Sequence, residues 1–479
     1  MNKSMRLLAL ILLGAAPLAQ AQDQPASLPV QPEMAPAAAP VAEPTAAEAV
    51  ATEVAPAGEA KKHCEGKCCG DKPQVSFCLG DVKFKVGLQY RVRDESRMHL
   101  NFADADGNSA NPSMIGQRAR FGLSADVKDA GSVVVEVQDV RDWGSEAVAG
   151  KPDADPTQND YNADALDVHQ AYGLWKVTDA LSLKLGRQEI NFDNERLVGA
   201  SDWKHQGRAF DAALLQYQSG AITARVFFSI LTKAGMGDAA APHTTTKDFG
   251  GLHLHHDLMP EFNPSLVFLV NADPAAGQKM FTAGTTFKGA VSDLSYEGEF
   301  YYQGGDKTKA VKQKAMMFGA NATYSMAGVA MKPTVGAHVD YLSGDDDATD
   351  DESKAFDTLF GTNHKFYGFQ DKFLVMGAPL GAGGTAGAGL MDVGPTVTLV
   401  PVEKLNVRLD WHVFQTAEDT AGGEKALGNE FDLTVKYPLN ALTTLQGGFS
   451  MFLPGKVFKD ANADAVSEQW AYLMLNFQL

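Results

Sequence analysis

The chain has 479 residues, and its 59 acidic side chains outnumber its 41 lysines and arginines to give a formal net charge of −18 at pH 7. So acidic a chain is a poor partner for nucleic acid, whose phosphates attract basic surfaces. Beyond the first residues there is no run of about 18 apolar residues, so the sequence offers no transmembrane helix.

The N-terminal residues predict export. Lys3 and Arg6 precede an apolar run at 7–13, and the small-residue site Ala-Gln-Ala follows at 19–21. This order is that of a secretory signal peptide spanning residues 1–21. The apolar run is too short to be a membrane anchor, and no cysteine follows the cleavage point, which argues against a lipoprotein.

Two short regions follow the signal peptide. Residues 22–62 are rich in Ala, Pro and Glu and cannot bury a core, so we expect a disordered periplasmic tether. Residues 63–79 form a cysteine-rich patch. An exported chain meets oxidising conditions, so disulfides are expected there, with a soft-metal site as the alternative and with no connectivity implied by the spacing. The candidate cysteines are Cys64, Cys68, Cys69 and Cys78.

Residues 80–479 alternate between apolar and polar positions, as in VKFKVGLQYRVR, QRARFGLSADV and KLNVRLDWHVF. Alternation over these lengths predicts half-exposed strands, and we expect about 18 of them. Their connections alternate between short and long. Short turns are expected at 128–131, 178–180, 219–220, 289–292, 327–330, 401–404 and 438–441, and long polar loops at 144–164, 191–207, 232–247, 343–388 and 454–467.

Two architectures fit this alternation. A soluble sandwich alternates as well, but 18 strands would require more than one domain. The terminal segment WAYLMLNFQL is an amphipathic strand that resembles the signal read by the barrel-assembly machinery of outer membranes. We therefore predict an all-β fold, a single closed antiparallel transmembrane β-barrel with short periplasmic turns and long extracellular loops. Such a protein would lie in the outer membrane of a Gram-negative bacterium as a monomer, in contact with membrane lipid and lipopolysaccharide.

Three segments carry a family resemblance. They are LGRQEINFDNERLVGASDWKHQGRAFDA at 185–212, AFDTLFGTNHKFYGFQD at 355–371 and GNEFDLTVKYPL at 428–439. They resemble the alginate export family of outer-membrane proteins. This resemblance implies an 18-stranded monomeric barrel with an arginine-lined constriction that passes an anionic uronate polysaccharide. It also implies pore-mouth or loop-anchoring roles for Arg196, Trp203, Arg208 and Asp211.

Alternate residues of each strand face the lumen, so the odd or even position of a residue in its strand predicts whether its side chain points inward. Basic candidates are Arg91, Arg93, Arg118, Arg120, Lys184, Arg225, Arg408 and Lys436, and acidic candidates include Asp126, Glu136, Glu297, Glu299, Asp340, Asp410 and Asp432. Arg187 is a further pore-lining candidate: it shares the parity of the lipid-facing leucines, and we expect a bulge at Gly186 to turn it inward. Guanidinium groups in a narrow lumen bind carboxylates in bidentate fashion and would select a polyuronate. The alternative is a network of ion pairs that stiffens the barrel.

The motifs of common enzymes are absent from the sequence: it contains no G-x-S-x-G, no H-E-x-x-H and no phosphate-binding loop. His253 and His255 share a strand face, but two imidazoles alone are weak evidence for a metal site. We therefore expect no catalysis, no cofactor and no metal. The predicted function is passive diffusion of a hydrophilic anion such as a uronate polysaccharide. The alternative is a general or small-organic-anion porin, and a barrel enzyme is the least favoured possibility.

The predicted loop at 343–388 has an acidic half and an aromatic half. Six of the eight positions from Asp345 to Glu352 are acidic, and aromatic residues follow from Phe356 to Phe369. We expect the acids to be solvated, with divalent bridging to lipopolysaccharide as the alternative. The aromatic half is too apolar to remain in solvent, so we expect it to pack into the pore mouth, where the loop would act as a lid or plug.

Overall fold

The computed structural model describes residues 75–102, 113–143, 164–233, 237–238, 241–242, 246–381 and 383–479. The predicted signal peptide (1–21), the tether (22–62) and three of the candidate cysteines (Cys64, Cys68 and Cys69) lie outside these residues. Cys78 is exposed and forms no disulfide with any described residue, so the disulfide prediction for the patch stays a prediction. No helix in the described part of the chain is both long and apolar enough to cross a membrane.

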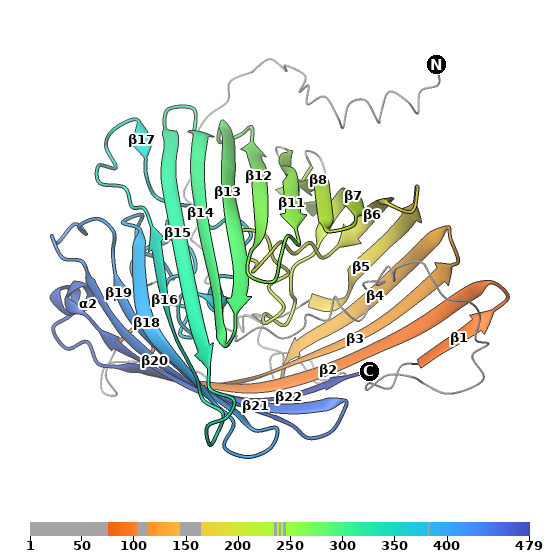
Figure 1. The fold of residues 1–479 in the computed structure, drawn as a ribbon. Coiled ribbons are helices and arrows are strands. Elements are labelled where there is room, and N and C mark those ends of the chain that lie inside the picture. Colours follow the sequence, from red (N-terminus) through yellow and green to blue (C-terminus); the bar gives the residue numbers. More distant parts are fainter. Residues whose placement is uncertain are drawn as a thin grey trace, which may run out of the picture. The chain divides into compact units, whose positions relative to one another are not determined.

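Within the described residues, eighteen long strands follow one another around a single sheet (Figure 1). They are β2 (Val82–Met98), β3 (Ser113–Val127), β4 (Gly131–Asp142), β5 (Asp164–Lys176), β6 (Leu181–Gln188), β7 (Phe210–Ser219), β8 (Ile222–Thr232), β11 (Lys247–His256), β12 (Asn263–Asp273), β13 (Gln278–Val291), β14 (Leu294–Asp306), β15 (Lys312–Ser325), β16 (Thr334–Leu342), β18 (Leu390–Leu399), β19 (Asn406–Gln415), β20 (Ala426–Pro438), β21 (Thr443–Pro454) and β22 (Glu468–Gln478).

The remaining elements are short. They are β1 (Val75–Leu79), which pairs with β2, the two-residue strands β9 (Gly237–Asp238), β10 (Ala241–Pro242) and β17 (Glu352–Ser353), the single-turn helices η2 (Leu100–Phe102) and η3 (Asn363–Lys365), and α2 (Lys456–Ala461).

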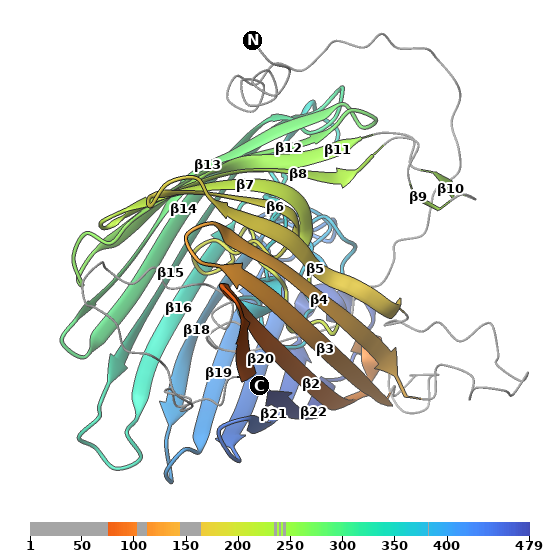
Figure 2. The same cartoon turned by 90° about the vertical axis from the view of Figure 1, so that its right-hand side faces the viewer.

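The sheet closes on itself. β2 pairs with β3 on one side and with β22 on the other, where the register runs from Gln89 opposite Gln478 to Met98 opposite Gln469. Every pair of neighbours among the eighteen strands is antiparallel. Figure 2 shows the same strands from a second side. Closure leaves no strand edge with unpaired backbone groups, which is the condition for a sheet to sit in lipid. The predicted barrel is confirmed.

Side chains alternate across the wall as the sequence predicts. In β3, Arg118 and Arg120 are 0% and 3% exposed, whereas Phe121 and Leu123, which follow them at alternate positions, are 49% and 39% exposed. Large apolar side chains such as Phe300 and Trp411 likewise point outward from β14 and β19. The barrel is therefore apolar outside and polar inside, the arrangement of a membrane barrel.

One end of the barrel has only short connections, and every connection of more than eight residues lies at the other end. The connections at 128–130, 177–180, 220–221, 257–262, 292–293, 326–333, 400–405 and 439–442 all follow even-numbered barrel strands, counting β2 as the first. We call this the short-turn end and the opposite one the long-loop end. Every short turn expected from the sequence lies at the short-turn end, and only the turn at 257–262 was not anticipated.

Two connections from the long-loop end fold into the barrel. The first inner loop, residues 189–209, joins β6 to β7, and the second inner loop, residues 343–389, joins β16 to β18. They meet at a parallel bridge between Val198 and Phe360, where the Gly199 N–H donates to the Phe360 carbonyl at 2.9 Å and the Phe360 N–H to the Leu197 carbonyl at 3.0 Å. The two loops therefore form one interlocked unit.

Aromatic side chains join this unit to the wall. Phe356, Tyr367 and Phe373 of the second inner loop are almost fully buried. Phe373 lies 4.9 Å from Phe414 of β19, ring centre to ring centre, and Phe360 lies 4.6 Å from Phe249 of β11. The aromatic half of the loop thus packs inside the barrel, as its composition predicts, and forms part of an apolar core there.

Candidate functional site

Four arginines of β2 and β3 hold the first inner loop by its backbone. Arg91 Nη2 donates to the Asp202 carbonyl at 2.7 Å, and Arg93 Nη1 donates to the Trp203 carbonyl at 3.0 Å. Arg118 Nη1 and Arg120 Nη2 reach the carbonyls of His205 and Gln206, each at 3.2 Å. We call these arginines the arginine row. Sequence parity places them correctly on the inner face, but their donors are directed at the loop, which favours an anchoring role.

One carboxylate of the loop lies within ion-pair distance of three members of the arginine row. Asp202 lies 2.9 Å from Arg118, 3.1 Å from Arg120 and 3.8 Å from Arg91. Burial opposes ionisation of Asp202, but the guanidinium groups outweigh it and hold its pKa well below the usual range. Charge-assisted contacts of this kind are stronger than neutral hydrogen bonds, so the middle of the loop is firmly fixed.

Arg196 anchors the other side of the same loop. Its Nη2 lies 2.6 Å from Glu299 of β14 and 2.7 Å from Asp340 of β16, and its guanidinium stacks 3.5 Å over the Phe366 ring. All three charged side chains are buried, so the two carboxylates depend on this one cation.

The other residues of the family resemblance divide into two groups. Arg208 Nη1 donates to the carbonyls of Gly199, at 3.1 Å, and Phe360, so it links the two inner loops. Trp203 receives the Arg93 guanidinium 3.9 Å above its ring. Asp211, in contrast, lies on the outer face of β7, where its side chain is 57% exposed.

Arg187 also lies on the outside, contrary to the expectation of an inward turn. β6 pairs with β5 and β7 without a shift in register, so there is no bulge at Gly186 and Arg187 stays on the face of Leu185. Its guanidinium forms a bidentate pair with Asp211 at 2.9 and 3.1 Å. An ion pair with Asp211 next to the long-loop end satisfies this charge without turning it into the lumen.

The second inner loop rests on acidic side chains of the wall. The Gln370 N–H donates to Glu430 Oε1 at 2.6 Å, the Phe369 N–H lies 3.4 Å from Asp432 Oδ2, and Lys372 forms an ion pair with Glu468. Gly368 makes the approach possible, because a Cβ at this position would lie 2.7 Å from the Glu430 carboxyl carbon. Asp432, predicted as pore-lining, is thus covered by the loop.

Among the described residues, several inward-facing cations lie near the short-turn end, and six of them are treated as one set. Four were selected from the sequence, and two others share the parity of lumen-facing neighbours but were missed. We call this set the basic mouth: Lys85, Lys184, Arg225, Lys288, Arg408 and Lys436. Two of its members are neutralised by wall carboxylates, since Lys85 lies 3.1 Å from Asp126 and Arg408 lies 2.7 Å from Asp410.

Lys184, Arg225 and Lys288 have other surroundings. Lys184 Nζ sits 3.9 Å over the Tyr172 ring, and Arg225 Nε donates to the neutral amide of Gln216 at 2.8 Å. Lys288 lines a cavity of about 200 Å³ together with Asp193, Asn194, Asn263, Ser265, Thr286 and Glu297. Among these cations, Lys288 therefore borders open space in the lumen, in a cavity that Asp193 and Glu297 also line.

A closed barrel of eighteen strands, apolar outside and with a charged inner wall, defines an outer-membrane channel. The chain belongs to the alginate export family, whose model matches residues 82–472. Family and fold point to a transport protein rather than an enzyme.

Solved structures share the fold at low sequence identity. OccK5 (OpdH) of Pseudomonas aeruginosa has a TM-score of 0.56 and 11% identity, over 84% of this chain and 98% of its own. OpdO of the same organism has a TM-score of 0.55 and 14% identity, over 83% and 97%. OccAB1 of Acinetobacter baumannii has a TM-score of 0.53 and 12% identity, over 83% and 97%. No curated protein matches the sequence.

Proposed function

We propose that this outer-membrane channel passes hydrophilic anions by passive diffusion, and that uronate oligosaccharides are its substrate class. The basic mouth is the observation that carries the proposal. We take the short-turn end as periplasmic, as in other outer-membrane barrels. Cations there would raise the local concentration of anions at the entrance to the lumen, because a charged opening with low-dielectric walls focuses the field.

The arginine row supports this proposal only indirectly. Its donors hold the first inner loop, and Asp202, Glu95 and Glu189 lie within 4 Å of its guanidinium groups. It would act on a solute by fixing the loop that borders the route. The carboxylate of a solute would meet Lys184, Arg225 and Lys288 first, because these side chains lie near the opening.

The test is ion selectivity in planar bilayers. The reversal potential in a salt gradient should show anion preference, and a Lys184→Gln, Arg225→Gln, Lys288→Gln variant should move it toward cations. Lys279→Gln is the matched control, because Lys279 lies on β13 with Lys288 but on the outward face at the other end. Absence of conductance in the parent protein would contradict the channel, and an unchanged reversal potential in the triple variant would contradict the role of the basic mouth.

The small-organic-anion alternative is favoured by the interlocked inner loops, which narrow the lumen. Block by a uronate monomer, a uronate oligomer and a neutral oligomer of equal length separates the possibilities. Block by the charged oligomer alone supports the uronate oligosaccharide. Equal block by monomer and charged oligomer favours a small-anion channel, and equal block by charged and neutral oligomers contradicts anion selectivity.

A further inference from the structure

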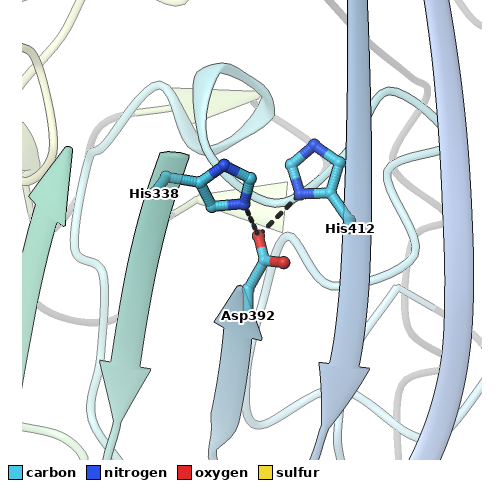
Figure 3. Close-up of side chains that lie close together, drawn as sticks. All are labelled: His338, Asp392 and His412. Carbon is cyan, nitrogen blue, oxygen red and sulfur yellow. Dashed lines mark hydrogen bonds and ion pairs between the residues drawn. The ribbon is translucent and has the colours of Figure 1, made fainter. Parts of the chain in front are cut away.

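Two histidines and an aspartate converge on the inner wall from three neighbouring strands (Figure 3). His338 lies on β16, Asp392 on β18 and His412 on β19. We propose that these three side chains form a binding site for a divalent transition metal of the zinc type. The proposal is independent of the anion selectivity proposed above.

The donor atoms are already at ligand-to-ligand separations. Asp392 Oδ2 lies 2.7 Å from His412 Nδ1 and 3.3 Å from His338 Nε2, and the three donor atoms all lie within 4.8 Å of one another. Ligands bound at about 2.0–2.2 Å in a tetrahedral site stand roughly 3.3–3.6 Å apart. Small side-chain rotations would therefore place one ion in contact with all three donors.

Gly394 creates the space in which the two imidazoles meet. It pairs with His338 in the β16–β18 register, and the pairs of Val393 with Val413 and Thr396 with Asp410 place it beside His412. A Cβ at Gly394 would lie 3.2 Å from His338 Cε1 and would collide with the Trp411 carbonyl. A larger residue on the middle strand would therefore separate the histidines, whereas glycine lets both rings lean toward Asp392.

The carboxylate has unused binding capacity. Asp392 is fully buried, and its Oδ1 accepts no hydrogen bond from any described residue. Other buried charges on this wall hold an inner loop, as Asp340 does through Arg196 and Asp432 through the Phe369 N–H. Asp392 instead contacts the two histidines, and its buried Oδ1 has no hydrogen-bond partner among the described residues.

A further carboxylate supports the set from behind. Asp432 Oδ2 lies 3.7 Å from His412 Nε2, the ring nitrogen opposite the one that faces Asp392. A carboxylate in this position commonly orients a metal-bound imidazole and makes it more basic.

The donor set selects the class of ion. Two imidazole nitrogens and one carboxylate suit Zn²⁺, Co²⁺, Ni²⁺ or Cu²⁺, whereas Mg²⁺ and Ca²⁺ prefer oxygen ligands alone. Three protein ligands leave a fourth position for water or an exchangeable anion. His338 is the most exposed of the three side chains, at 16%.

Cobalt binding to the full-length protein tests the proposal. The protein should be free of any histidine tag, stripped with a chelator and alkylated at cysteine, so that neither a tag nor the cysteine-rich patch binds the ion. We expect one equivalent of Co²⁺ to give visible d–d absorption that Zn²⁺ removes. Asp392→Asn and His412→Gln should each weaken binding by more than about tenfold, since even the loss of a residue that only orients a ligand costs that much.

His255→Gln is the matched control, because His255 is also an inner-wall histidine beside a carboxylate, with Nε2 3.0 Å from Asp257. It should bind cobalt as the parent does. Heat-modifiable migration in gel electrophoresis shows whether each variant is a folded barrel. If the Asp392 and His412 variants are not folded, His338→Asn replaces them in the test, because it removes the most exposed of the three ligands. A parent without cobalt absorption, or folded variants of the triad that keep it, would show that the three residues form only an ion-paired network.

Discussion

At the scale of single residues, Arg196 and Arg187 both form bidentate ion pairs with carboxylates, but the Arg196 pair is buried and the Arg187 pair is exposed. Arg196 is buried with Glu299 and Asp340, whereas the Arg187 side chain is 41% exposed beside Asp211. Removing one partner of a buried pair costs about 3–5 kcal/mol, while an exposed pair contributes about 0–1 kcal/mol. We expect Arg196→Ala to lower the free energy of unfolding by the larger amount and Arg187→Ala by the smaller, measured by urea titration in detergent. Equal losses would contradict the assignment of Arg196 as an anchor.

His205 gives the first inner loop a dependence on pH. Burial lowers the pKa of its imidazole well below the usual range, and Arg93, Arg91 and Arg118 lower it further, while Asp202 opposes them. His205 also packs against Gly116, where a Cβ would lie 2.5 Å from its Nε2. The docked loop therefore holds a neutral imidazole, and an undocked loop would bind a proton more readily.

The sign of the effect follows from this difference. Docking is strongest above the ordinary histidine pKa of about 6.5 and weakens as the pH falls below it, by at most about 1.4 kcal/mol per pH unit. Asp202 adds nothing in this range, because its lowered pKa matters only below about 3.9. We expect channel conductance to rise between about pH 6.5 and about pH 5, and His205→Gln to remove this rise. A rise that persists in the variant would assign the effect to another group.

At the scale of elements, the second inner loop should govern the width of the lumen. Its acidic half is exposed, and its aromatic half is packed against β11 and β19. Deleting residues 345–370 should raise single-channel conductance severalfold, because the deletion removes Phe356, Phe360 and Tyr367 from the lumen. Replacing Asp346, Asp347, Asp350 and Asp351 by Asn is the control and should leave the conductance near that of the parent. Unchanged conductance after the deletion would show that this loop does not obstruct the route.

The sequence predicted elements better than it predicted their contacts. Strand alternation and turn residues are local signals, so the strands and the placement of seven short turns could be read directly. The bridge between Val198 and Phe360 joins segments distant in sequence, and no local pattern indicates it. Likewise, parity placed Arg118 on the inner wall but carried no information on the carbonyls it would meet. The inward orientation of Lys85 and Lys288 could also have been predicted from the sequence, because they share the parity of their inward-facing neighbours.

At the scale of the whole molecule, the depth of a residue in the membrane should decide how well the outer face tolerates charge. Phe300 and Leu294 both point outward from β14, near the middle of the strand and at its short-turn end, respectively. Arginine costs about 2–4 kcal/mol at the bilayer midplane and about 0–1 kcal/mol near the interface. Phe300→Arg should therefore reduce the free energy of folding into vesicles by more than Leu294→Arg, and equal effects would contradict this placement of β14.

The arginine row also bears on how freely the sequence of the first inner loop can change. The arginines recognise the main-chain oxygens of the segment from Asp202 to Gln206, and the contact with the second inner loop likewise runs through backbone groups at Leu197, Gly199 and Phe360. Every residue type offers a carbonyl oxygen, so most of these contacts would survive replacement of the side chains that lie between them. Part of the path of the loop is thus fixed through its main chain, while the side chains of Asp202 and Arg196 fix the rest. Positions held only by a main-chain oxygen can change their side chains, so a channel of this design could alter its preference for solutes while keeping its architecture.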